Sequence, residues 1–139
     1  MRKVLPALAA LAAAAAVTLV NAGPAVATGE ALGCYVTPSR TQPVLHPRIC
    51  SDNMPADSYQ AMFGLVDGSG TYSYSWSVPA AYAGNISSGC TQDATYCLLT
   101  NLAPLDLVAV SVTIGQNGVS STLTARANIG QWCGNQRCL

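Results

Sequence analysis

The sequence contains six cysteines, and an even number of cysteines in a short chain limits the possible folds more than any other feature. They are Cys34, Cys50, Cys90, Cys97, Cys133 and Cys138. Many pairings are possible, and the short gaps favour neighbours: Cys34–Cys50, Cys90–Cys97 and Cys133–Cys138. A zinc site is the alternative, but no Cys-x-x-Cys spacing occurs and His46 is the single histidine. The cysteines therefore predict a disulfide framework and no metal site.

The N-terminal residues have the three-part layout of a secretory signal. Met1-Arg2-Lys3 precede a mainly apolar stretch from Val4 to Val20, and the small-residue triplet Ala25-Val26-Ala27 follows. A transmembrane anchor needs about 20 strongly apolar residues, whereas this stretch is shorter and mainly alanine. A lipoprotein would need a cysteine directly after it, and Cys34 lies further on. We expect a signal peptide over residues 1–27 and a secreted, extracellular product with no membrane segment after cleavage.

The exported part is small and poor in cations. It holds 112 residues, which suits a single domain over residues 28–139. Its charged side chains are four arginines, no lysine and six acids, a formal charge near −2. Nucleic acid and anionic membranes bind clustered cations, so neither is an expected partner. The alanine-rich, lysine-free composition is typical of a bacterial protein.

Two apolar segments predict a first β-hairpin. Residues Thr71 to Val78 alternate strictly, with aromatic residues on one face and serines on the other, which indicates a half-buried strand. Tyr59 to Val66 is a second apolar run. The link Asp67-Gly68-Ser69-Gly70 has turn chemistry, so we expect the two strands to pair across it.

A second hairpin is predicted around Asn117-Gly118, a dipeptide that supplies the positive φ of a two-residue turn. It lies between Leu107 to Ile114 and Val119 to Ile129. With this turn as the loop, the expected apolar-face pairs are Ile114 with Ser121, Val112 with Leu123, Val110 with Ala125 and Val108 with Ala127. The polar-face pairs are Thr113 with Thr122 and Ser111 with Thr124. Turn type and side-chain pattern agree, which fixes the register.

The remaining strands complete the predicted fold class. Shorter strands are expected at about Leu32 to Thr37 and Tyr96 to Leu102, and a turn near Pro79-Ala80-Ala81-Tyr82. Prolines at positions 38, 43, 47 and 55 interrupt the segment before Tyr59. Short strands that each carry one polar face predict an all-β fold: a two-sheet antiparallel β-sandwich stapled by disulfides.

Part of the chain resembles a known family. The stretch from Gly68 to Val78 with Trp76, and the step Leu102-Ala-Pro104 leading into Val108 to Ile114, are similar to the strand B to strand G half of bacterial immunoglobulin-like domains, including PKD and fibronectin type III variants. The resemblance covers about residues 57–130. It implies an immunoglobulin-like sandwich with Trp76 in the core and the Leu-x-Pro step between strands E and F.

Two features depart from that family. Val108 stands where a fibronectin-type domain has its corner tyrosine, and the cysteines do not match the inter-sheet disulfide of antibody domains. Such folds host many functions, so the resemblance does not by itself identify an activity.

The sequence offers little catalytic chemistry. His46 with a distant serine and Asp52 or Asp57 could form a triad, but no Gly-x-Ser-x-Gly motif marks a nucleophile. Carboxylate pairs for sugar hydrolysis would have to come from Glu30, Asp52, Asp57, Asp67, Asp93 and Asp106, most of which have turn or cap positions. No dense Asp-x-Asp run favours calcium, and no glycine motif favours phosphate. We expect a protein that is not an enzyme and has no cofactor.

The C-terminal tail contains the candidate binding residues. They are Trp132, Asn135, Gln136 and Arg137, in a loop closed by the last cysteine pair; Trp and Arg are frequent in binding hot spots. The alternative is that Trp132 packs back on the sandwich and the disulfide only holds a fraying end. Tyr72 and Tyr74 could line a sugar-binding face, but their spacing favours a core position beside Trp76. Asn85-Ile86-Ser87 fits a glycosylation acceptor, expected to be unmodified in a bacterial protein.

These observations favour a secreted, monomeric, non-catalytic binding protein that recognises an extracellular protein or polysaccharide. One alternative is an inhibitor of an extracellular hydrolase, a protease or glycosidase. The Cys34 to Cys50 spacing and the Arg137-Cys138-Leu139 ending resemble bacterial α-amylase inhibitors, whose Trp-Arg-Tyr triplet is absent here. The other alternative is a structural surface component, against which the Ser and Thr faces of the strands argue.

Overall fold

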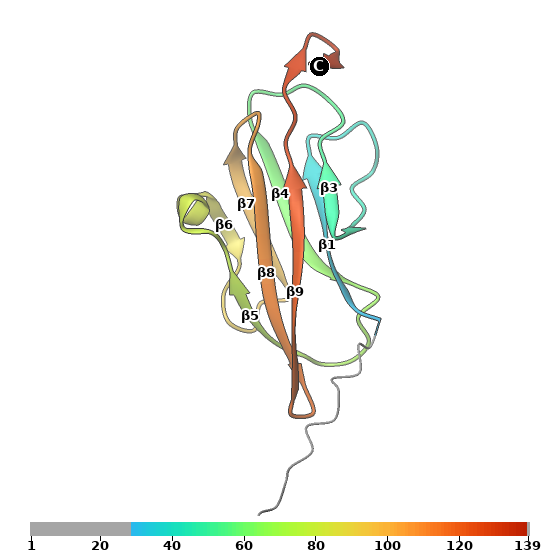
Figure 1. The fold of residues 1–139 in the computed structure, drawn as a ribbon, viewed down its shortest axis with the longest axis vertical. Helices are drawn as coiled ribbons and strands as arrows, with labels where there is room; N and C mark the ends of the chain where they lie inside the picture. The colour runs from blue at the N-terminus through green and yellow to red at the C-terminus, as the bar shows by residue number, and fades with distance from the viewer. Residues whose placement is uncertain (1–28, 139) are drawn as a thin grey trace, which may run out of the picture.

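The computed structural model describes residues 29–138 (Figure 1), so the expected signal peptide, residues 1–27, lies outside the described part. The described chain is mostly β-strand. One sheet contains five strands in the order β2-β1-β4-β7-β6, and the other contains four in the order β3-β9-β8-β5. The five are β2 (His46–Pro47), β1 (Ala31–Thr37), β4 (Tyr59–Val66), β7 (Tyr96–Leu102) and β6 (Ile86–Gly89); the four are β3 (Ile49–Ser51), β9 (Val119–Asn128), β8 (Leu107–Gln116) and β5 (Ser73–Ser77).

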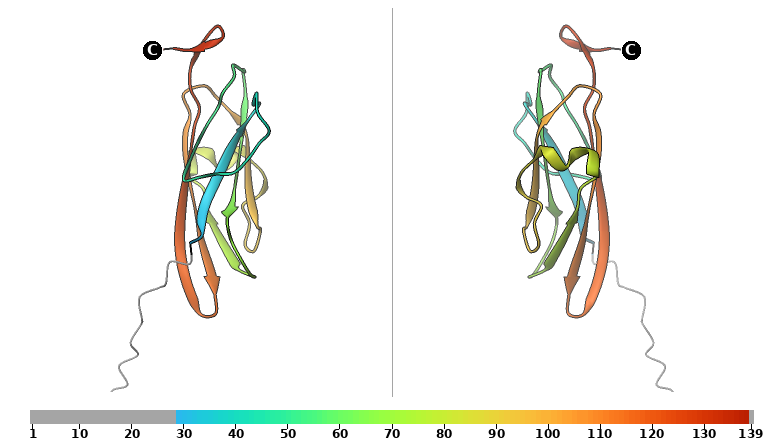
Figure 2. Two further views of the ribbon diagram at one scale, coloured as in Figure 1. Left: turned by 90° about the vertical axis from the view of Figure 1, so that its right-hand side faces the viewer. Right: turned by 90° about the vertical axis from the view of Figure 1, so that its left-hand side faces the viewer.

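The two larger sheets form two layers around one core (Figure 2). Alternate residues of each strand point inwards, as the period of two requires. Tyr59, Phe63 and Leu99 come from the five-stranded sheet and pack in one buried cluster with Val108 and Val110 from the four-stranded sheet. The predicted all-β class with two packed sheets agrees with this arrangement.

The hairpin around Asn117-Gly118 forms with the predicted register. Every predicted pair occurs between β8 and β9, from Val108 opposite Ala127 to Ile114 opposite Ser121. On the solvent side, the hydroxyl oxygens of Thr113 and Thr122 lie 2.9 Å apart and those of Ser111 and Thr124 lie 2.8 Å apart. Cross-strand hydroxyl pairs thus reinforce the register on the polar face.

The predicted hairpin between Tyr59 to Val66 and Thr71 to Val78 is wrong. The two segments form β4 and β5, which lie in different sheets: β4 pairs with β1 and β7, whereas β5 pairs with β8. The link between them contains Asp67 and Gly70 at positive φ, as a turn requires, but it crosses from one layer to the other. Turn residues specify a change of direction and do not specify which strand becomes the neighbour.

The segment interrupted by prolines contains two short strands that the sequence did not predict. Pro47 is tolerated because β2 lies at the edge of its sheet, where a missing N–H costs no ladder bond. The sequence predicted purely antiparallel sheets. β3 pairs in parallel with β9, so this prediction is wrong for one edge of the four-stranded sheet. The chain therefore passes from β2 in one sheet to β3 in the other across the single residue Arg48, which brings Cys50 back beside Cys34.

All three predicted disulfides form. Cys34–Cys50, Cys90–Cys97 and Cys133–Cys138 have Cα–Cα distances of 5.6, 4.2 and 5.1 Å, and no cysteine among residues 29–138 is free. Three disulfides in so small a domain indicate an oxidising environment. Over the same residues, no helix has the length and apolar character that a membrane crossing requires.

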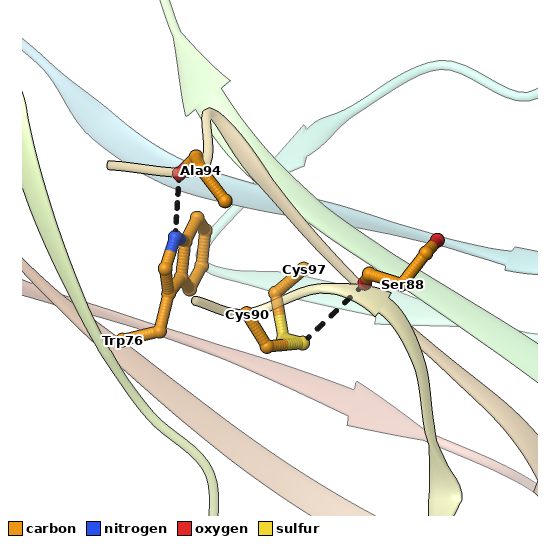
Figure 3. Close-up of a disulfide and its surroundings, with 5 residues drawn as sticks. All are labelled: Trp76, Ser88, Cys90, Ala94 and Cys97. Atoms are coloured by element: carbon orange, nitrogen blue, oxygen red, sulfur yellow. Dashed lines mark hydrogen bonds between the residues drawn. A yellow bond between two sulfur atoms is a disulfide. The ribbon is translucent and has the colours of Figure 1, made fainter. Parts of the chain in front are cut away.

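The Cys90–Cys97 loop joins the two layers at one side of the molecule. Trp76 of β5 donates its indole N–H to the main-chain oxygen of Ala94 in this loop, at 2.6 Å (Figure 3). The main-chain N–H of Asp93 bonds to the oxygen of Tyr74 at 3.0 Å, on the edge of the same strand. Trp76 itself is half-buried and packs against the core, with Tyr72 and Tyr74 beside it. The disulfide loop thus covers an edge that would otherwise expose unpaired backbone groups.

The predicted turn after Pro79 forms as a 3₁₀ helix, η1 (Ala80–Asn85). It ends at Asn85, whose side-chain amide donates to the main-chain oxygens of Thr100 and Asn101 at 2.9 and 3.0 Å. This amide nitrogen is the atom that glycosylation would modify. The modification replaces one of its two hydrogens, so at least one of the two bonds would be lost.

Substituting Gly118 should test the turn on which the β8–β9 register depends. Gly118 has a φ of 77° and open space where a side-chain Cβ atom would lie, so Gly118→Ala introduces backbone strain and no clash. We expect the free energy of unfolding to fall by about 1 kcal/mol, measured by urea denaturation. Gly84→Ala is the matched control because it also meets open space but lacks the positive φ, and it should stay within about 0.5 kcal/mol of the wild type. Equal effects of the two changes would contradict the strained-turn account.

Candidate binding site at the C-terminal end

Asp52 is the one buried polar or charged residue among those described. It follows β3 directly and lies two positions after the buried half-cystine Cys50, on the same face of the extended chain. Its side chain is fully removed from solvent. A buried carboxylate is stable only when hydrogen-bond donors or cations surround it, so its partners define how this end of the molecule is built.

The donors to Asp52 all come from the C-terminal tail. Its Oδ1 atom accepts from the main-chain N–H of Gly130 at 2.7 Å and from the guanidinium of Arg137 at 2.5 Å. Its Oδ2 atom accepts from the indole N–H of Trp132. Arg137 also donates to the main-chain oxygen of Asp52 at 3.0 Å. The carboxylate thus holds three points of the tail against the end of the sandwich.

The tail itself is a small stapled hairpin. Strands β10 (Trp132–Cys133) and β11 (Gln136–Arg137) pair antiparallel, and the Cys133–Cys138 disulfide closes them. The N–H of Cys138 donates to the oxygen of Gln131 at 3.0 Å. The hairpin extends beyond the end of the two sheets, opposite to the β8–β9 turn (Figures 1 and 2). The guanidinium carbon of Arg40 lies 6.0 Å from the centre of the Trp132 ring, which adds a cation–π contact.

Tyr59 organises a neighbouring loop. The buried Tyr59 hydroxyl accepts from the N–H of Ala56 at 2.9 Å and donates to the oxygen of Met54 at 3.1 Å. Burial raises the pKa of this hydroxyl above its ordinary value of 10.0, and the nearby Asp52 and Asp57 carboxylates raise the pKa further. The loop that precedes β4 is therefore fixed to the core by one side chain.

A hollow of about 580 Å³, open to solvent, lies between this loop and the tail. Its lining residues are Pro55, Ala56, Asp57, Pro104, Gln131, Trp132 and Gly134. Small-molecule sites commonly occupy about 300–1,000 Å³, so the hollow is large enough for a ligand. Asp57 and Gln131 are exposed and Trp132 is half-buried. The hollow thus combines an aromatic ring, two proline rings, one carboxylate and one amide.

The predicted tail residues separate into two groups. Trp132 and Arg137 converge on Asp52, and Trp132 also packs against the core, as the structural alternative expected. Asn135 and Gln136 are exposed on the hairpin and take no part in that contact. Sequence reasoning did not identify the lining role of Asp57 or Gln131, and it treated Asp52 only as a catalytic candidate. The position of Asp52, two residues after a buried cysteine, was the available signal.

The catalytic candidates do not come together around Asp52. Its carboxylate is occupied by the tail, and His46 is exposed in the edge strand β2. Asp67 and Asp93 have positive φ values typical of turns, and Asp106 accepts from the N–H of Ala103 at 2.7 Å. Within residues 29–138, no group of three or more His, Cys, Asp or Glu side chains could hold a metal ion.

Comparison with known proteins identifies no family for this chain. No protein family, curated protein sequence or solved structure matches this chain.

Removing the Asp52 carboxylate should release the tail. Asp52→Ala leaves the Trp132 and Gly130 donors and the Arg137 charge without their acceptor, and we expect the free energy of unfolding to fall by about 3 kcal/mol. Urea denaturation measures this loss, and the Trp132 indole N–H signal in the NMR spectrum should move to a solvent-exposed position. Asp57→Ala, an exposed carboxylate at the same end, is the control and should cost less than about 0.5 kcal/mol. Comparable losses in both variants would rule out the anchoring role.

Tyr59 should make stability depend on alkaline pH. Because the folded-state pKa is raised, the contribution of this hydroxyl is complete below about pH 10 and is lost as the pH rises through the folded-state pKa. Urea denaturation of the wild type and Tyr59→Phe at increasing pH tests this. The wild type should be the more stable protein at neutral pH, and its advantage should shrink above pH 10. A constant difference across that range would show that the hydroxyl does not titrate in this way.

Proposed function

We propose that the chain is a secreted bacterial protein of the immunoglobulin-like class that recognises an extracellular partner without reacting with it. The strand order supports the class. Sheets ordered β1-β4-β7-β6 and β9-β8-β5 correspond to the ABED and CFG sheets of immunoglobulin constant-type domains. The signal-like residues 1–27 and the three disulfides support export into an oxidising compartment.

The observation that carries the proposal is the fixation of the tail by Asp52. A hairpin with a disulfide, an ion pair and a buried carboxylate loses little conformational freedom when a partner binds. The Cys133–Cys138 disulfide closes the hairpin on itself and does not attach it to the sandwich. Three further donors to one buried carboxylate fix the orientation of Trp132 and Arg137, the two residue types most enriched at binding hot spots.

The chemistry beside the hollow supports binding without catalysis. Asp57 is the exposed carboxylate of the lining, and both oxygens of Asp52 already accept N–H donors. General acid–base hydrolysis uses two groups that can exchange protons with the substrate. One available carboxylate can accept hydrogen bonds from a ligand, but general acid–base hydrolysis would need a second proton-exchanging group.

Capture from the source culture tests this function. The mature, oxidised protein is immobilised and exposed to culture supernatant and to the cell-wall fraction. We expect saturable capture of one protein or polysaccharide, reduced at least about tenfold in Trp132→Ala/Asn135→Ala, because hot-spot residues dominate binding. This variant keeps the Arg137–Asp52 ion pair, and circular dichroism should verify its fold.

The matched control is Val119→Ala/Ser120→Ala, two exposed residues at the start of β9, next to the β8–β9 turn that lies opposite to the tail hairpin (Figure 1). It should capture the partner as the wild type does. A captured protease or glycosidase whose activity falls in the complex would identify the protein as a hydrolase inhibitor. Capture by neither form, together with self-association on gel filtration, would instead establish a structural surface component and reject the recognition function.

A further inference from the structure

The hollow beside the tail has the chemistry of a sugar site. We infer that it binds a neutral saccharide, a segment of an uncharged glycan chain, and this inference rests on the proposed recognition function. The ligand would lie between Trp132 and Gln131 on the tail and Asp57 on the opposite loop.

Trp132 is the aromatic side chain of the lining, and a saccharide would stack on the part of its ring that Arg40, 6.0 Å from the ring centre, leaves open. A pyranose has an apolar face of C–H groups and a rim of hydroxyls, and an aromatic ring suits the apolar face. The indole N–H of Trp132 is bonded to Asp52, so the orientation of the ring is set before a ligand arrives. Pro55 and Pro104 add rigid apolar surface to the same hollow, with no side-chain donors or acceptors to satisfy.

Asp57 and Gln131 supply the polar contacts. A carboxylate accepts two or more hydrogen bonds, and an amide both accepts and donates, which matches the mixed character of sugar hydroxyls. Both residues are exposed, so neither loses a buried partner when a ligand binds. These two side chains lie on separate loops, and each loop is fixed independently: Tyr59 holds the first and Asp52 holds the second.

The charge of the hollow selects against acidic ligands. Asp57 is the charged residue of the lining. The nearby Arg137 guanidinium already forms an ion pair with Asp52 at 2.5 Å, and Arg40, which is not part of the lining, lies over the Trp132 ring. No cation of the lining therefore faces a phosphate, sulfate or uronate group. The open shape suits a chain that passes over the surface better than a small molecule enclosed on all sides.

Titration with a defined panel of oligosaccharides tests this inference. Neutral hexasaccharides of glucose, xylose, mannose and N-acetylglucosamine are added to the mature protein, with polygalacturonate as the acidic probe and fully deacetylated chitosan oligomers as the cationic probe. We expect at least one neutral oligosaccharide to bind, with shifts of the Trp132 indole N–H signal in the NMR spectrum, and no binding of the acidic probe.

Variants then connect the binding to the hollow. Gln131→Ala should weaken the affinity about threefold to tenfold, as expected for loss of one hydrogen bond. Asp57→Asn should weaken it by a similar or smaller factor and leave it insensitive to salt, because the amide still accepts. Both residues are exposed, so these variants should fold normally. The control Ser120→Ala lies at the other end of the molecule and should bind as the wild type does.

The outcomes separate this inference from the proposed function. If no neutral oligosaccharide binds but a protein is captured through the tail, the saccharide assignment is wrong and the recognition function stands. If neither binds, both are wrong. If only the chitosan oligomers bind, in a salt-sensitive way that Asp57→Asn abolishes, the hollow is a cation site and the neutral class is overturned.

Discussion

The carboxylate of Asp52 is the contact on which the C-terminal end depends. Burying a charge is unfavourable unless donors replace the lost water, and here every donor comes from residues about eighty positions later in the chain. The tail has too few apolar residues to fold as a separate unit, and its disulfide limits its shape without attaching it to the sandwich. The ion pair with Arg137 and the bonds from Gly130 and Trp132 provide that attachment. One residue directly after the three-residue strand β3 thus decides whether the hollow has two walls or one.

Local sequence patterns predicted the parts of the fold that depend on neighbours in the chain. The β8–β9 hairpin formed in the expected register because Asn117-Gly118 sets the turn and the facing residues agree with it. The three disulfides joined nearest cysteines for a similar reason. The same logic failed for β4 and β5, because the glycine-rich link between them permits either a hairpin or a crossing between layers. Packing of the core selects the crossing between layers, because β4 and β5 each pair with strands distant in sequence. The parallel pairing of β3 with β9 could not be predicted from local patterns either, because the two strands are far apart in the sequence.

The candidate site was predictable by residue type and not by arrangement. Trp132 and Arg137 stand out in a short stapled tail, and both lie at the site. Their common partner, Asp52, offered one signal, its position two residues after Cys50; a single aspartate among proline and polar residues otherwise resembles any loop residue. Asp57 and Gln131 are ordinary exposed residues until the fold brings their loops together. The two walls of the hollow come from opposite halves of the chain, so neither wall alone indicates a site.

The link between Cys34 and Cys50 also decides how the molecule would respond to mechanical load. The described chain begins at the end of the molecule opposite to the tail hairpin, as the blue and red ends of the ribbon show (Figure 1). Tension applied between those ends passes from β1 through the disulfide into β3, and from there across the parallel ladder to β9. The two strands are then pulled in opposite directions along their length, so the hydrogen bonds of the ladder are loaded together and do not open one after another. The residues between the two cysteines stay slack, because the covalent bridge bypasses them. A protein anchored at one end and bound to a partner at the other would therefore transmit force through the Cys34–Cys50 bridge and the β3–β9 ladder.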